Sequence, residues 1–201
     1  MIFKQLTKLT PAEALLILDT SKCSFKSLLK STLMDLFLKK VLKVIRVKKT
    51  STSGKSRILA YIVVGENFYS YTPLPHEMIF LHSFKKRNNI RIQFRHVIKS
   101  AIEQSGGFKS YKRFFIMRTT TLRASLKDGF FVKMFNLIIL NENGKVLQRN
   151  LKLEVSYLEK ELAQLLNSNE KKATELVHRV NGHIFILNSI DIGIFLSLIH
   201  I

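Results

Sequence analysis

The hydrophobic positions in the first part of the chain recur at helical spacing and are separated by helix start signals. Thr10 and Glu13 flank a proline at capping-box spacing, which predicts a helix that begins there. Ser24 is the expected cap of a second helix. A third helix is predicted within residues 31–40, after a tight turn at residues 30–32.

Beyond these helices the pattern changes to runs of β-branched residues. Residues 41–47 and 58–64 are rich in valine and isoleucine, and a cluster of lysine, threonine, serine and glycine separates them. These features predict two strands joined by a polar turn. Three short helices followed by a two-stranded hairpin is the order of elements in a winged-helix unit, with the hairpin as the wing.

The middle of the chain repeats this order more loosely. Its helical patterns cover residues 74–87, 89–104, 108–117 and 119–129, and a strand, a turn and a second strand are expected within residues 130–153. A weak self-similarity between the segments that begin at Ser31 and Thr120 also favours a tandem pair of units.

The last part of the chain predicts a pair of helices with balanced charge. Apolar residues recur at helical spacing within residues 155–166, and Asn169 is the expected cap of a second helix that an Asn-Gly pair ends. The apolar segment 183–201 contains Asp191, and an acid is costly near a bilayer centre. We therefore expect a buried strand and a short helix in that segment instead of a membrane anchor.

Together these elements predict an α+β fold that is mainly helical, with tandem winged-helix-like units and a C-terminal helix pair. The expected domains are a first winged-helix-like unit over residues 1–72, a linking helix with a second winged-helix-like unit over residues 73–150, and C-terminal helices with an apolar tail over residues 151–201.

The distribution of charge adds a functional expectation to this fold. The 201-residue chain has a net charge of +19, and residues 36–135 hold 21 basic and 4 acidic side chains. A basic excess of this size repels itself in a folded protein, which favours a polyanionic partner. A compositional bias toward lysine is the alternative explanation.

Two groups of basic side chains are the candidate polyanion contacts, because lysine and arginine contacts to phosphate supply affinity without sequence information. The first group lies on the expected hairpin and comprises Lys43, Arg46, Lys48, Lys49, Lys55 and Arg57. The second group is drawn from a basic helical run over residues 85–127 and comprises Arg118, Arg123 and Lys127, at the last helix of the second unit. On the helix before the hairpin, Met34 and Leu38 lie outside the main apolar face, which makes them candidate interface residues.

The sequence lacks several patterns that catalysis or metal binding requires. The tripeptide GKS at residues 54–56 resembles the end of a phosphate-binding loop, but Lys49 stands where that loop requires glycine, and a strand pattern follows. His76 and His82 are too far apart on one helix to share a metal ion. We expect each histidine to be a surface or capping residue. We also expect no metal, no cofactor and no enzymatic activity.

The segments "LTPAEALLILD" and "FKSLLKSTLMDLFLKKVLKV" carry two resemblances, which cover residues 6–47. With its Thr-Leu-Met-Asp-Leu run at residues 32–36, this region resembles the cytosolic winged-helix region of uncharacterised bacterial membrane proteins. Through Leu9, Glu13, Leu15 and Leu16 it also resembles the opening of the Golgi phosphoprotein family, whose members bind phosphoinositide head groups. The second resemblance implies a membrane-surface partner, and no head-group-binding residue of that family matches a position here.

The combined expectation is a non-enzymatic, basic, winged-helix-type binding module for a polyanion such as nucleic acid. One alternative is a peripheral membrane protein that binds anionic lipid head groups. Another is a protein–protein interaction module, which includes a homodimer. The chain has a single cysteine and no signal-peptide pattern, so we expect a cytoplasmic protein, with membrane association as the alternative. No small-molecule substrate is indicated.

Overall fold

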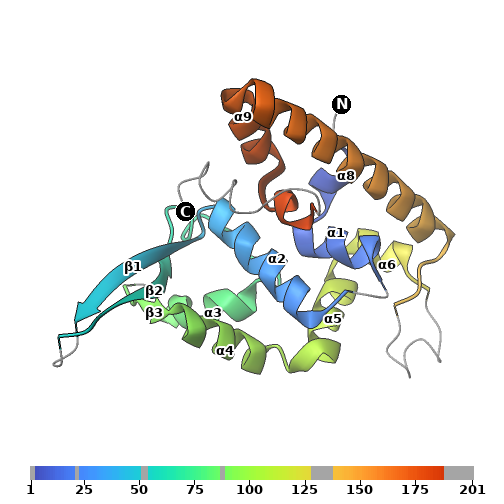
Figure 1. Ribbon diagram of the computed structural model, residues 1–201. Coiled ribbons are helices and arrows are strands. Elements are labelled where there is room, and N and C mark those ends of the chain that lie inside the picture. Colours follow the sequence, from blue (N-terminus) through green and yellow to red (C-terminus); the bar gives the residue numbers. More distant parts are fainter. Residues whose placement is uncertain (1–2, 21–22, 51–53, 87–88, 128–137, 188–201) are drawn as a thin grey trace. The chain divides into compact units, whose positions relative to one another are not determined.

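The computed structural model describes residues 3–20, 23–50, 54–86, 89–127 and 138–187 (Figure 1). The protein is α+β and mainly helical, and the described residues contain one three-stranded antiparallel sheet in the order β1-β2-β3. The chain forms two compact units. We call Leu36–Lys112 the hairpin unit, and Met1–Asp35 with Arg113–Ile201 the split unit. The three domain ranges expected from the sequence stay a prediction.

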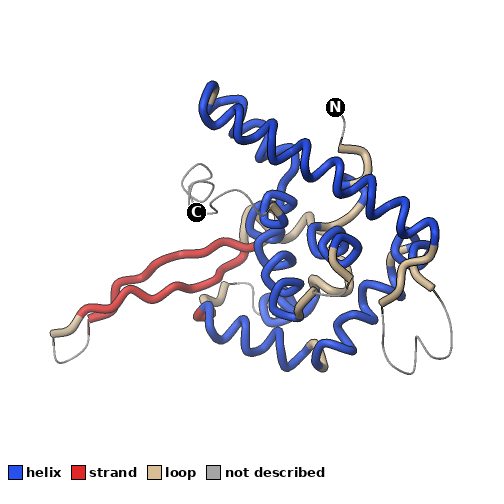
Figure 2. The backbone as a smooth tube through the Cα atoms, turned by 45° about the vertical axis from the view of Figure 1, so that its right-hand side comes forward, coloured by secondary structure: helices blue, strands red, loops and turns tan. Residues whose placement is uncertain are grey.

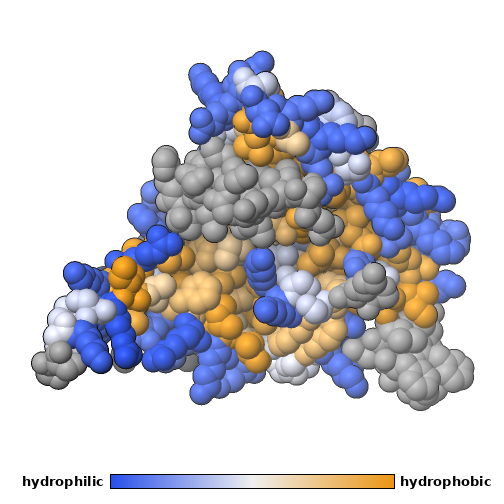
Figure 3. Space-filling view, viewed as in Figure 1, coloured by the Kyte–Doolittle hydropathy of each residue, from blue (hydrophilic) through white to orange (hydrophobic). Residues whose placement is uncertain are grey.

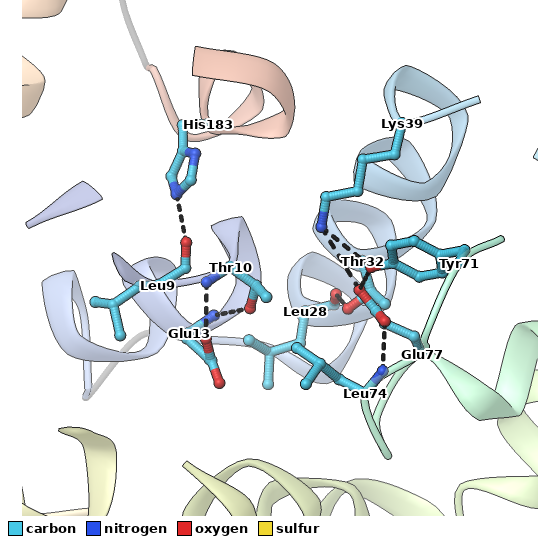
Figure 4. Close-up of polar contacts among 10 residues, drawn as sticks. All are labelled: Leu9, Thr10, Glu13, Leu28, Thr32, Lys39, Tyr71, Leu74, Glu77 and His183. Carbon is cyan, nitrogen blue, oxygen red and sulfur yellow. Dashed lines mark hydrogen bonds and ion pairs between the residues drawn. The ribbon is translucent and has the colours of Figure 1, made fainter. Parts of the chain in front are cut away.

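The first helix of the split unit confirms its predicted start. A 3-10 turn, η1 (Leu6–Lys8), precedes α1 (Pro11–Leu18). The Thr10 hydroxyl accepts a hydrogen bond from the Glu13 amide, and the Thr10 amide donates to the Glu13 carboxylate at 2.7 Å (Figure 4). Two of the amides that every helix start leaves unpaired are thereby satisfied.

The predicted break between a second and a third helix is wrong. A single helix, α2 (Phe25–Leu38), runs through residues 30–32. Its start is as predicted, because the Ser24 hydroxyl accepts from the Ser27 amide at 3.1 Å. The Thr32 hydroxyl donates to the Leu28 carbonyl one turn earlier (Figure 4), so this polar residue is satisfied inside the helix and does not end it. In the described residues before the hairpin there are thus two α-helices where three were expected.

The hairpin unit confirms the predicted pair of strands. The strands β1 (Leu42–Thr50) and β2 (Ser56–Val64) pair over their full length, and the short strand β3 (Ile92–Gln93) adds to β2. The helices of this unit are α3 (Met78–Lys86) and α4 (Phe94–Gln104), and α5 (Gly107–Arg118) continues from it. The predicted helix over residues 89–104 therefore begins later than expected, because Ile92 and Gln93 form β3 and pair with β2.

The predicted second hairpin is also wrong. Residues 145–153, expected as a strand, lie in α8 (Glu142–Ser168), a helix of 27 residues. The Asn141 side chain accepts a hydrogen bond from the Gly144 amide at 2.9 Å, so the expected turn is a helix cap. The other expected strand, residues 130–140, lies largely outside the described residues; Leu140 at its end forms an isolated bridge with Leu126.

The remaining helices of the split unit follow the prediction more closely. The short helix α6 (Thr120–Ser125) lies within the expected range 119–129. The Asn169 side chain caps α9 (Glu170–Val180), and this helix ends before Asn181, which has a positive φ of 48°. A 3-10 helix, η2 (Asn181–Ile186), stands where the expected strand of the apolar segment was to begin. Residues 188–201 of that segment lie outside the described residues. Among the residues that the structure describes, no helix combines the length and the apolar character needed to cross a membrane.

Candidate nucleic-acid interface

The register of the hairpin divides its side chains between two faces. Leu42 lies opposite Val64 and Thr50 lies opposite Ser56, so an even-numbered residue always pairs with an even-numbered one. Since successive side chains of a strand point to opposite faces, we call the two sides the even face and the odd face. The even face carries Arg46 and Lys48, and the odd face carries Lys43, Lys49 and Arg57.

The outer part of the hairpin is exposed on both faces. Leu42 and Ile62, near the base of the hairpin, are buried. Residues 48–50 and 56–58 are all exposed, and the Ile58 side chain on the even face is 70% exposed. The outer ends of β1 and β2 lie away from α3 and α4 in Figure 1, and Figure 2 shows the two strands as a twisted ribbon. The hairpin therefore presents a two-sided surface that its own unit leaves open.

Tyr61 is the centre of a polar cluster on the odd face. Its hydroxyl accepts a hydrogen bond from the Gln93 side chain at 3.5 Å, and the Lys49 ammonium lies 5.9 Å from the centre of its ring. The Gln93 hydrogen bond, followed by Lys49 and Arg91, lowers the pKa of the Tyr61 phenol below 10.0. Lys49 is thereby placed over an aromatic ring, where a cation is favoured.

The charge of the hairpin unit is strongly unbalanced. The sequence of residues 36–112 holds 16 basic and 3 acidic side chains, a net charge of +13. Residues 42–64 hold six of these cations and no acid. Hydrophilic side chains accordingly gather over the outer hairpin, around a smaller hydrophobic area (Figure 3).

The three acids of the hairpin unit pair with lysines that lie off the hairpin. Glu66 is 3.4 Å from Lys40. Glu77 is 3.8 Å from Lys39, and Glu103 is 3.9 Å from Lys99. The carboxylates of this unit are therefore engaged by these lysines.

A buried polar cluster after β2 was not found from the sequence. The Glu77 side chain, 1% exposed, accepts hydrogen bonds from the Tyr71 hydroxyl at 2.8 Å and from the Leu74 amide at 2.7 Å (Figure 4). Lys39 donates to the Tyr71 oxygen at 3.3 Å. Burial, with the nearby Glu77 charge, raises the pKa of Tyr71. These contacts fix the segment that joins β2 to α3.

The expectation that every histidine is a surface or capping residue is wrong for His76. His76 is 2% exposed, and burial, with a smaller contribution from the Lys39 charge, lowers its pKa to about 3. His183 is buried in the split unit, where one ring nitrogen lies 2.9 Å from the carbonyl of Val180, at the end of α9, and caps that helix. The other ring nitrogen lies 3.0 Å from the Leu9 carbonyl (Figure 4). In the described part of the chain, no group of three histidine, cysteine or acidic side chains is arranged to hold a metal ion.

The second group of predicted basic contacts lies in the split unit. Arg118 is the last residue of α5, Arg123 is exposed on α6, and Lys127 is exposed beyond the end of that helix. The last helix of the expected second unit is therefore shorter than predicted. The Thr119 hydroxyl, just before this helix, donates to the Glu13 carboxylate. The structure thus brings together the six hairpin cations on β1, β2 and their connection, and it places the other three in a different unit.

The predicted interface residues on α2 are partly covered. Met34 and Leu38 are half-buried, and Leu33, Leu36 and Phe37 are buried, as the apolar pattern predicted. An interface at Met34 and Leu38 stays a prediction.

Comparison of the chain with protein-family models, with curated proteins and with solved structures found no match. The two resemblances seen in the sequence therefore stay predictions.

Proposed function

We propose that the protein is a non-enzymatic module that binds a polyanion such as nucleic acid through the β1–β2 hairpin. The observation that carries this proposal is the exposed outer hairpin, which holds cations on both faces and no acid. The acids of the same unit pair with lysines elsewhere, so they leave this positive surface in place.

The chemistry of binding is contact between phosphate and exposed lysine and arginine. Each contact releases a counterion from the nucleic acid, so the affinity falls steeply as salt rises. The hydroxyls of Thr50 and Ser56, 3.2 Å apart near the tip, add hydrogen-bonding groups for phosphate. In the finer form of the proposal, α1, α2 and the hairpin act as a winged-helix-like unit, and Arg118, Arg123 and Lys127 form a further contact patch.

A second candidate function is binding to an anionic membrane surface. It is favoured by Ile58, an exposed apolar side chain opposite Lys48 on the even face, because peripheral membrane proteins combine apolar insertion with attraction to anionic lipid. Flotation with anionic and with neutral vesicles tests this function, and equal binding to both, or to neither, contradicts it.

The main proposal is tested by a matched pair of variants. The hairpin variant replaces Lys48, Lys49, Lys55 and Arg57 with alanine, and the control variant replaces Lys85, Arg95, Lys99 and Lys109, which are exposed on helices of the same unit. Both variants lose four charges. At low salt we expect the hairpin variant to bind labelled duplex DNA on the order of tenfold or more weakly, and the control variant within about threefold of the natural protein. Equal losses in the two variants would show that net charge alone decides binding.

A further inference from the structure

We propose that the outer hairpin enters the major groove of duplex DNA, with the even face toward one phosphate wall and the odd face toward the other. This inference rests on the proposed function and adds the identity of the polyanion and the way it is held. It follows from three features: the division of cations between the faces, the dimensions of the ribbon and a repulsive cross-strand pair.

The division of cations fits a partner with two walls. Arg46 and Lys48 point to one side of the ribbon, and Lys49 and Arg57 point to the other. A membrane is flat, so a ribbon that lies on it uses one face and leaves the cations of the other face in water. A nucleic-acid groove is lined by phosphates on both sides, and cations on both faces of the ribbon then contact phosphate together.

The dimensions of the exposed ribbon fit the major groove of B-form DNA. That groove is about 12 Å wide and about 8.5 Å deep, and it admits a two-stranded β-ribbon. Residues 48–50 of β1 and 56–58 of β2, which are all exposed, extend over roughly 10 Å at the usual rise of a strand. The exposed part of the two strands is therefore about as long as the groove is deep. Duplex RNA fits less well, because the major groove of an A-form helix is deep and narrow.

One cross-strand pair brings two cations together on the odd face. Lys49 and Arg57 lie directly opposite each other on the odd face, where like charges repel. Residues 42–64 contain no acid that relieves this repulsion, and Arg91 adds positive charge near the same face. A phosphate beside this pair converts the repulsion into two favourable contacts.

The test compares the two faces. One variant carries Arg46→Ala and Lys48→Ala, the other carries Lys49→Ala and Arg57→Ala, and the control carries Lys99→Ala and Lys109→Ala. We expect both face variants to bind a DNA duplex at least about fivefold more weakly than the natural protein. We also expect the slope of the logarithm of their binding constant against the logarithm of salt concentration to be shallower by about 2. The control should stay close to the natural protein in both quantities. Glutamine at the same four positions gives the same result if charge, and not folding, is responsible.

The outcomes separate this inference from the proposed function. If only one of the two face variants weakens DNA binding, insertion into the major groove is wrong, while polyanion binding by the hairpin stands. The same conclusion follows if single-stranded DNA, duplex RNA or anionic vesicles bind the protein as tightly as duplex DNA does. If neither face variant nor the four-alanine hairpin variant changes binding, the proposed function itself is wrong, and this inference falls with it.

Discussion

Tyr61 is the residue at which the chemistry of the odd face is most directly measurable. The Gln93 hydrogen bond and the charges of Lys49 and Arg91 hold the pKa of its phenol below 10.0. We expect Lys49→Ala to raise this pKa, because the variant removes a cation that favours the phenolate. Duplex DNA raises it as well if a phosphate neutralises Lys49. Ultraviolet titration measures the phenolate, with Tyr61→Phe to assign the signal.

An unchanged Tyr61 pKa in the Lys49→Ala variant would contradict the arrangement of the odd face. An unchanged pKa in the DNA complex would place the phosphates elsewhere on the protein.

His76 is the residue for which pH matters most to stability. Its pKa is lowered from 6.5 to about 3 in the folded protein, so between these values the unfolded chain binds a proton that the folded protein does not. The free energy of unfolding is therefore expected to fall as pH falls from about 6.5 toward 3, by up to about 1.4 kcal/mol per pH unit. Chemical denaturation at several pH values measures this slope.

His76→Gln removes the titrating group, and His82→Gln, at an exposed position on α3, is the matched control. The slope should be reduced in the first variant and kept in the second. The same slope in both variants would show that His76 is accessible to protons in the folded state.

At the scale of elements, the base of the hairpin depends on Gly65. Its amide donates to the Val41 carbonyl at 2.8 Å, and a Cβ atom at Gly65 would lie 2.1 Å from the Lys40 carbonyl oxygen. We expect Gly65→Ala to lower the free energy of unfolding by about 2 kcal/mol or more, because backbone has to move.

Gly54→Asn is the control at the other end of the hairpin. Gly54 has a positive φ of 75° and open space around it, and asparagine tolerates that conformation. The control is expected to be close to neutral in thermal or chemical denaturation. A neutral Gly65→Ala would contradict the close approach at the hairpin base.

Elements with local signals were predictable from the sequence. The capping box at Thr10, the Asn169 cap and the hairpin each depend on residues close together in the chain. Two elements were misread because the same residue types serve two structures. Ser31 and Thr32 resemble a turn but are buried inside α2, and Asn141 to Gly144 resembles a hairpin turn but caps α8.

The site was predictable in composition and not in geometry. The six hairpin cations follow from the sequence, because they lie between two strand-like runs without an acid. Their division into two faces depends on the register, which the strand pattern alone does not specify. The positions of Gln93 and His76 depend on contacts distant in the sequence, so no local pattern indicated them.

At the scale of the whole molecule, the positive charge is concentrated in one unit. The hairpin unit has a net charge of +13 in 77 residues, and the split unit, with 17 basic and 11 acidic side chains, has a net charge of +6. A general lysine bias would give similar charge densities in both units. The imbalance therefore favours a localised binding surface, and it makes salt the most informative variable.

The most direct measurement is the slope of the logarithm of the duplex-DNA binding constant against the logarithm of salt concentration. For the natural protein we predict a slope on the order of −4 or steeper, and for the four-alanine hairpin variant a slope shallower by about 3.6, since each phosphate contact contributes about 0.9. The control variant should keep the natural slope. The absence of DNA binding at low salt, or one slope shared by the natural protein and the hairpin variant, would contradict the proposal that this hairpin binds nucleic acid.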